Sequence, residues 1–145
     1  MTRLVALQHM TNVQPHGTGI VENMIKEAGE EAGIPESLAQ QARPVGAVSY
    51  VASAEAGQAV KRDVLFTFDL ELPPDFTPVA TDGEVQSFEL RHVHDVMETV
   101  AFTDRYKTNC NLVLIDFFFR HGLLDPGAPG FLELLAALRQ SHVCT

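Results

Sequence analysis

The first clear element of the chain is a helix with one apolar face. Apolar residues recur every three or four positions from residue 20 to residue 32, which is the spacing of a helix lying on a core. This face comprises Val21, Met24, Ile25, Ala28 and Ala32. Either Gly19 or Thr18 can cap this helix, and Glu22 is at the capping-box position if Gly19 is the cap. Gly33 followed by Pro35 predicts the end of the helix.

The remaining pattern alternates strands and helices. Strands are predicted at residues 4–8, 45–52, 64–72 and 84–90, the last with a bend near its middle. Helical segments are predicted at 36–41, 93–101, 109–120 and 131–139. Residues 109–120 are apolar on nearly every side, so we expect this helix to be largely buried or to contact a partner. The order of elements predicts an α/β fold.

Composition limits the class of protein. A length of 145 residues, 46% of them hydrophobic and 20% charged, predicts one domain over residues 1–145. The net charge of −9 argues against nucleic acid or an anionic membrane as partner, because both are polyanions. Two cysteines, Cys110 and Cys144, suggest reduced thiols rather than a disulfide framework. With no secretory segment or transmembrane run in the sequence, we expect a cytoplasmic protein.

Three carboxylates share one face near the end of the first helix. Glu27, Glu30 and Glu31 are related by three and four positions, so their side chains are neighbours and repel one another. A hard divalent cation such as Mg²⁺ or Mn²⁺ would relieve this repulsion, since it prefers oxygen ligands. Most glutamate-rich helix faces are solvated surface, and composition and spacing alone leave both interpretations open.

The order of residues within this helix is more specific. Residues 26–34, Lys-Glu-Ala-Gly-Glu-Glu-Ala-Gly-Ile, resemble the second half of the Nudix box, with Lys26 at the usual arginine. Other segments resemble one branch of that superfamily, the Nudix domain related to thiamine pyrophosphokinase. These segments are residues 42–50, 63–66, 68–73, 82–85 with Phe88, 109–117 and 120–122, and the similarity covers roughly residues 13–140.

The resemblance implies a fold, a reaction and a set of residues. The fold would be a Nudix-type α/β/α sandwich with a mixed sheet. The reaction would be metal-dependent hydrolysis of a small-molecule diphosphate, in this branch a damaged thiamine diphosphate that yields a monophosphate. Glu27, Glu30 and Glu31 would bind Mg²⁺ or Mn²⁺ and Lys26 would orient a carboxylate. Glu84 would be a further ligand or base, unless it is simply a solvated acid in a turn.

The chain departs from the family pattern near its beginning. The resemblance places a glycine and a glutamate of the full box at positions where this chain has Asn12 and Thr18. Residues 1–12 provide less strand material than the family usually has, which indicates a shortened member with N-terminal strand missing or a misplaced start. An open sheet edge would invite pairing with a second copy, so a homodimer is one expectation.

Three hypotheses therefore remain open. The first is a hydrolase of a thiamine-diphosphate-like compound, and the second is a hydrolase of ADP-ribose or a nucleotide sugar. The third is a shortened Nudix fold that binds a ligand without turning it over. A zinc site at the His-x-His pair His92 and His94, with Cys110, is disfavoured, because no further ligands occur at the usual spacing.

Overall fold

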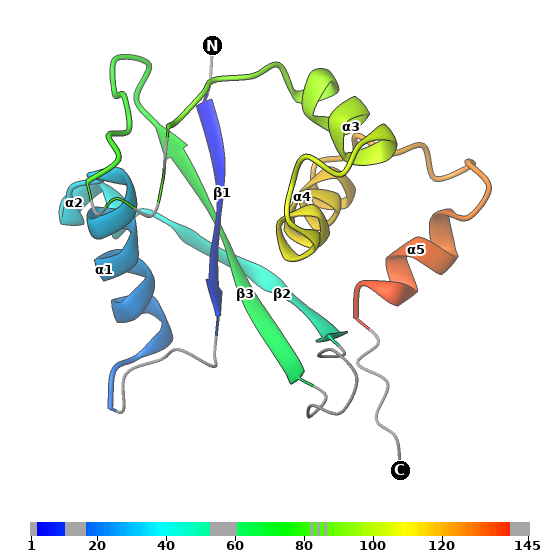
Figure 1. Ribbon diagram of the computed structural model, residues 1–145, viewed down its shortest axis with the longest axis horizontal. Helices are drawn as coiled ribbons and strands as arrows, with labels where there is room; N and C mark the ends of the chain where they lie inside the picture. Colours follow the sequence, from blue (N-terminus) through cyan, green and yellow to red (C-terminus); the bar gives the residue numbers. More distant parts are fainter. Residues whose placement is uncertain are drawn as a thin grey trace. The chain divides into compact units, whose positions relative to one another are not determined.

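The computed structural model describes residues 3–10, 17–52, 61–81, 83, 85 and 87–139, with backbone alone at 3–10, 52, 61 and 62. Figure 1 shows the elements along the chain. They are β1 (Arg3–Met10), α1 (Ile20–Ala32), α2 (Glu36–Ala39), β2 (Arg43–Ala52), β3 (Lys61–Leu72), α3 (Val93–Phe102), α4 (Thr108–Arg120) and α5 (Phe131–Ala137). None of the described helices is long and apolar enough to cross a membrane.

The strands form a small sheet in the order β1-β3-β2. The central strand β3 runs opposite to both neighbours, so the sheet is antiparallel (Figure 1). The predicted α/β class is confirmed. The mixed pairing expected from the sequence does not occur among these three strands, where every neighbouring pair is antiparallel.

The chain divides into two compact units, and both long strands β2 and β3 contribute to each of them. The first unit comprises residues 1–46 and 66–91, and the second comprises residues 47–65 and 92–145. In the first unit, α1 and α2 pack with part of β3. The buried core there consists of Met24, Ala28, Ala32, Ile34, Ala39, Phe68, Leu70 and Leu72.

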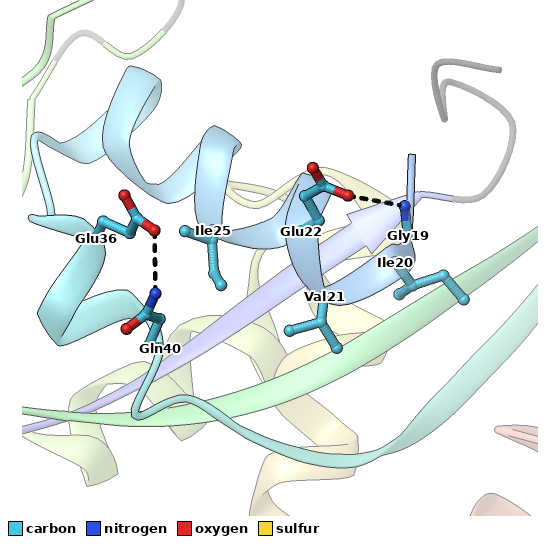
Figure 2. A pocket seen from close by; sticks show the side chains of 7 residues that line it. All are labelled: Gly19, Ile20, Val21, Glu22, Ile25, Glu36 and Gln40. Carbon is cyan, nitrogen blue, oxygen red and sulfur yellow. Dashed lines mark hydrogen bonds between the residues drawn. The ribbon is translucent and has the colours of Figure 1, made fainter. Parts of the chain in front are cut away.

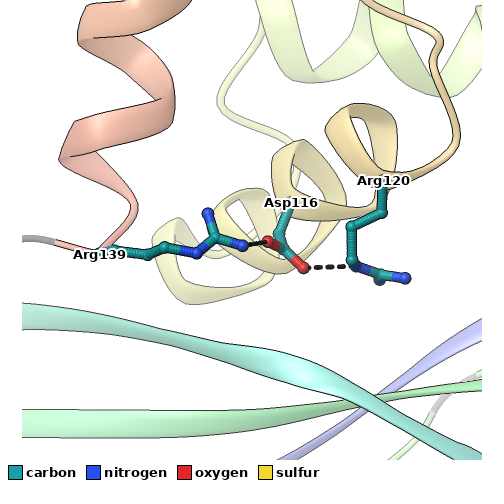
Figure 3. Close-up of polar contacts among 3 residues, drawn as sticks. All are labelled: Asp116, Arg120 and Arg139. Atoms are coloured by element: carbon teal, nitrogen blue, oxygen red, sulfur yellow. Dashed lines mark hydrogen bonds and ion pairs between the residues drawn. The ribbon is translucent and has the colours of Figure 1, made fainter.

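The second unit contains α3, α4 and α5. The α5 end is attached to β2, because the backbone N–H of Ser49 donates to the carbonyl oxygen of Leu138 at 3.3 Å. The rings of Phe119 and Phe131 meet edge to face, with centroids 4.8 Å apart, which joins α4 to α5. A buried ion-pair network completes this unit. The carboxylate of Asp116 accepts from Arg120 at 2.7 Å and from Arg139 at 2.5 Å (Figure 3).

One predicted strand does not appear in the part of its range that the structure describes. Residues 85 and 87–90 are not in a strand, while Glu84 and Gln86 lie outside the described residues. The alternation that suggested a strand leaves Phe88 and Leu90 exposed instead of placing them on a core. Strand β3 is buried at its even positions 68, 70 and 72. Several odd positions are buried as well, among them the polar Thr67 and Asp69.

Candidate metal site on the acidic helix

Helix α1 is capped by a glycine at each end: Gly19 is the cap out of the two residues that the sequence offered, and the predicted end at Gly33 is confirmed. At its start the backbone N–H of Gly19 donates to the Glu22 carboxylate at 3.4 Å. At its end Gly33 adopts the left-handed conformation, with φ of 62°, which a residue without a Cβ adopts at little cost. The N–H groups of Gly33 and Ile34 then turn back to the carbonyl oxygens of Gly29 and Ala28, at 3.0 and 3.1 Å. These contacts define the last turn of α1.

The apolar face of α1 sets the orientation of its carboxylates. Met24, Ala28 and Ala32 are buried in the first unit's core. The carboxylate side chains lie on the flank of this face, where Glu27 is partly buried and Glu30 and Glu31 are exposed. The three side chains therefore share a helix face, which confirms their relative placement but not their role.

Sequence reasoning missed Asn23. This residue precedes Glu27 by four positions, so it continues the carboxylate stripe by one turn, and its side chain is only 1% exposed. In the sequence, the signal for a buried Asn23 was a polar residue at helical spacing from apolar neighbours. The stripe thus runs from a buried amide to exposed carboxylates at the end of the helix.

The charge distribution of α1 favours a bound cation. Glu30 and Glu31 lie in the last turn, where the helix dipole is negative, and this turn contains no basic residue. Carboxylates are unfavourable at this end of a helix, so a positive charge placed here is stabilised by both the side chains and the dipole. Lys26 supplies part of it, since its ammonium lies 3.1 Å from the Glu30 carboxylate. The hydrogen bond and the charge of Glu30 raise the pKa of Lys26 above its ordinary value.

A segment distant in sequence contacts the end of α1. The backbone N–H of Val79 donates to the carbonyl oxygen of Ala32 at 3.0 Å, and the Thr81 hydroxyl donates to the carbonyl oxygen of Glu30. Glu84 follows Thr81 by three residues but lies outside the described residues. The structure therefore places Val79 and Thr81 against the acidic turn of α1.

The carboxylates do not form a closed metal cage. In the described ranges, no three His, Cys, Asp or Glu side chains are arranged to hold a metal ion. His92 precedes α3, where its Nδ1 accepts from the His94 backbone N–H at 3.4 Å and the two rings stack. These histidines therefore lie at the start of a helix. An exposed set of carboxylates suits Mg²⁺, which retains several waters and takes few protein ligands.

A pocket of about 590 Å³ lies beside α1, lined by Gly19, Ile20, Val21, Glu22, Ile25, Glu36 and Gln40. Figure 2 shows Ile25 and Val21 projecting from α1, with Glu36 on α2 and Gln40 directly after its end. Ile25 and Glu27 are two positions apart, which separates their directions by about 200° around the helix axis. The pocket is therefore distinct from the carboxylate face.

The second unit contains a polar pair that the sequence did not indicate. The Tyr50 hydroxyl donates to the Asp63 carboxylate at 2.8 Å, across strands β2 and β3. Asp63 is 2% exposed. Burial, together with the hydrogen bond to Asp63, raises the pKa of Tyr50 to about 12. The pair satisfies part of a buried carboxylate's hydrogen-bonding capacity.

The fold and the acidic helix define a small α/β domain whose carboxylate face is suited to a divalent cation. No family model matches the chain. The chain is 50% identical over 125 residues to Nudix hydrolase 24, chloroplastic, of Arabidopsis thaliana, and 49% identical over 125 residues to Nudix hydrolase 20, chloroplastic, of the same plant. It is also 31% identical over 133 residues to an uncharacterized protein of Saccharomyces cerevisiae.

These alignments cover 86%, 86% and 84% of this chain but only 34%, 33% and 39% of the relatives. The chain thus spans about a third of the length of the curated relatives it matches. Identity near 50% over most of the chain supports the Nudix hydrolase family and agrees with a Nudix α/β fold. It does not identify the branch related to thiamine pyrophosphokinase.

The expected cytoplasmic location is wrong. It rested on the reduced thiols and on the lack of a secretory segment, and neither property distinguishes the cytoplasm from an organelle interior. The two Arabidopsis relatives are named as chloroplastic proteins, which points away from the cytoplasm.

Proposed function

We propose that this protein hydrolyses a diphosphate linkage in a small molecule with the help of a divalent metal ion. The observation that carries the proposal is the acidic last turn of α1, which combines exposed carboxylates with the negative end of the helix dipole. The similarity to two proteins named Nudix hydrolases supports the same reaction class.

Each site residue has a proposed role. Glu30 and Glu31 are the main metal ligands, because their carboxylates are exposed and share one face. Glu27 is a ligand or the base, and its partial burial limits its motion. Lys26 orients Glu30 through the 3.1 Å ion pair. Glu84 is a further ligand or base, supported by the contact of Thr81, three residues earlier, with the end of α1.

The chemistry follows from charge. A diphosphate repels an attacking water, and a bound Mg²⁺ or Mn²⁺ supplies the positive charge that offsets this repulsion and lowers the pKa of the water. Glu30 and Glu31 provide the negative face that holds this charge next to the helix. Lysine has a point charge and not the planar fork of arginine, so Lys26 fixes the direction of Glu30 less strictly than an arginine would.

For the substrate we propose a thiamine-diphosphate-like compound, such as an oxidised thiamine diphosphate, with a monophosphate as product. This choice is supported by the sequence segments that resemble the branch related to thiamine pyrophosphokinase. The carboxylate face determines the reaction and not the leaving group. ADP-ribose and nucleotide sugars are therefore the competing substrates in the test.

The test measures monophosphate release from thiamine diphosphate, its oxy analogue and ADP-ribose, with Mg²⁺ and then with excess chelator. We expect metal-dependent turnover of the oxy analogue. Glu30→Gln or Glu31→Gln should lower the rate at least about a hundredfold, equivalent to about 2.7 kcal/mol of barrier. Glu98→Gln, an exposed glutamate on α3, is the matched control and should retain full activity.

Three outcomes contradict parts of this proposal. Full activity in excess chelator would exclude the metal. Turnover of ADP-ribose alone would keep the reaction and change the substrate. Tight binding of a diphosphate without product, in folded protein, would indicate a binding module.

A further inference from the structure

We infer that Thr81, together with Val79, is a positioning element for the carboxylates of α1, an inference that rests on the function proposed above. Thr81 and Val79 form what we call the brace, two hydrogen bonds from the segment after β3 to the last turn of α1. The Thr81 hydroxyl donates to the Glu30 carbonyl oxygen and the Val79 N–H to the Ala32 carbonyl oxygen.

The end of α1 requires such partners. The last four carbonyl groups of a helix have no partner within the helix, and helix ends fray when these groups are unsatisfied. Gly33 turns its N–H back to one of them, at Gly29, and the brace supplies donors to Glu30 and Ala32. Fraying would separate Glu30 from Glu31, since both lie in this turn. The brace therefore keeps the two carboxylates on a common face.

The contact is specific to this part of the fold. Thr81 and Glu30 are 51 positions apart, so the bond depends on the folded first unit and not on local sequence. Gly33 contributes by its backbone conformation, because at a φ of 62° a side chain would be strained, although a Cβ would make only an ordinary contact with the Val79 carbonyl oxygen. Helix end, glycine and brace thus form one unit around the acidic turn.

Thr81→Val tests the inference, because it removes the hydroxyl and keeps the shape of an exposed side chain. We expect the Mg²⁺ concentration for half-maximal rate, and the Kd for Mn²⁺ measured by electron paramagnetic resonance, to rise about three- to tenfold. The rate at saturating Mg²⁺ should change less than twofold. Thr81→Ser keeps the donor and should restore Mn²⁺ binding. Thr77→Val, at an exposed threonine of the same segment, is the matched control.

Amide hydrogen exchange provides a readout that requires neither metal nor substrate. In Thr81→Val, exchange should be about fivefold faster at Gly33 and Ile34, whose N–H groups close the last turn, and unchanged in α4. Unchanged exchange and unchanged Mn²⁺ affinity, or equal loss in Thr81→Ser, would overturn the inference. A wild-type protein that neither binds Mn²⁺ nor releases monophosphate would overturn the proposed function. Hydrogen exchange in Thr81→Val would then still test whether the brace stabilises the last turn of α1.

Discussion

Two ion pairs with the same sequence spacing have opposite surroundings in this protein. Lys26 and Glu30 on α1 are four positions apart, with side chains 54% and 52% exposed. Asp116 and Arg120 on α4 are also four positions apart, but their side chains are 0% and 16% exposed. Spacing alone therefore says nothing about the role of a pair. The difference in burial is informative: an exposed pair can exchange partners, whereas the fold requires a buried pair.

The buried pair is part of a larger network. Asp116 accepts from Arg120 on its own helix and from Arg139 beyond the end of α5 (Figure 3). The Asp116 carboxylate is completely buried. Water therefore cannot take the place of either arginine without a large desolvation cost. The exposed pair lacks this constraint. The Glu30 carboxylate can leave Lys26 for a metal ion at little cost, because solvent screens the pair.

The largest expected effect is on the buried network. Asp116→Asn removes the negative charge between two guanidinium groups and should lower the free energy of unfolding by about 3 kcal/mol. Urea denaturation followed by circular dichroism measures this loss. Asp104→Asn, at an exposed aspartate in the same unit, is the control and should leave the urea midpoint unchanged. Equal midpoints for Asp116→Asn and wild type would mean that burial does not separate the two pairs.

The contrast also shows what could be predicted from the sequence. Helix α1 was predictable because its apolar spacing, Gly19 and Gly33 all agree, and the shared face of Glu27, Glu30 and Glu31 follows from helix geometry. The brace was not predictable, because a threonine hydroxyl 51 positions away gives no local signal.

The predicted strand at 84–90 failed for a related reason. Alternation reports which residues could share a face, but Phe88 and Leu90 are exposed, with no strand formed around them. The network at Asp116 was equally hidden, because an aspartate within an apolar helix looks like an interruption until Arg139 is placed beside it. Long-range partners, and not local propensity, decided the brace and the network.

An intermediate effect is expected at the pair of Tyr50 and Asp63, where one partner is buried and the other is partly exposed. Burial and the hydrogen bond raise the pKa of Tyr50 to about 12, above its ordinary value of 10. The folded protein therefore retains the phenolic proton where the unfolded chain has lost it. The resulting stabilisation is complete below pH 10 and decreases as the pH rises from 10 through 12.

The prediction is tested by urea midpoints measured between pH 8 and 12, about four pH units that include this transition. In the wild type the midpoint should fall above pH 10, and in Tyr50→Phe this part of the fall should be weaker. Tyr106→Phe, at the chain's other tyrosine, is the control and should leave the profile as in the wild type. Identical profiles for Tyr50→Phe and the wild type would show that the tyrosine does not titrate as the structure indicates.

The smallest stability effect is expected at the exposed pair, and it completes the comparison. Lys26→Met keeps the aliphatic length of the side chain and removes its charge. The urea midpoint should change little, because an exposed pair four positions apart on a helix contributes little to stability. Metal binding should respond instead. Without Lys26 the Glu30 carboxylate loses its competing ammonium but also its orientation, since the two groups lie 3.1 Å apart. If orientation is the role of Lys26, Lys26→Arg will bind Mn²⁺ more tightly than Lys26→Met, because a guanidinium holds a carboxylate by two parallel hydrogen bonds. If the ammonium only competes with the metal, Lys26→Met will bind Mn²⁺ more tightly than either basic residue, and the exposed pair is then ordinary helix surface.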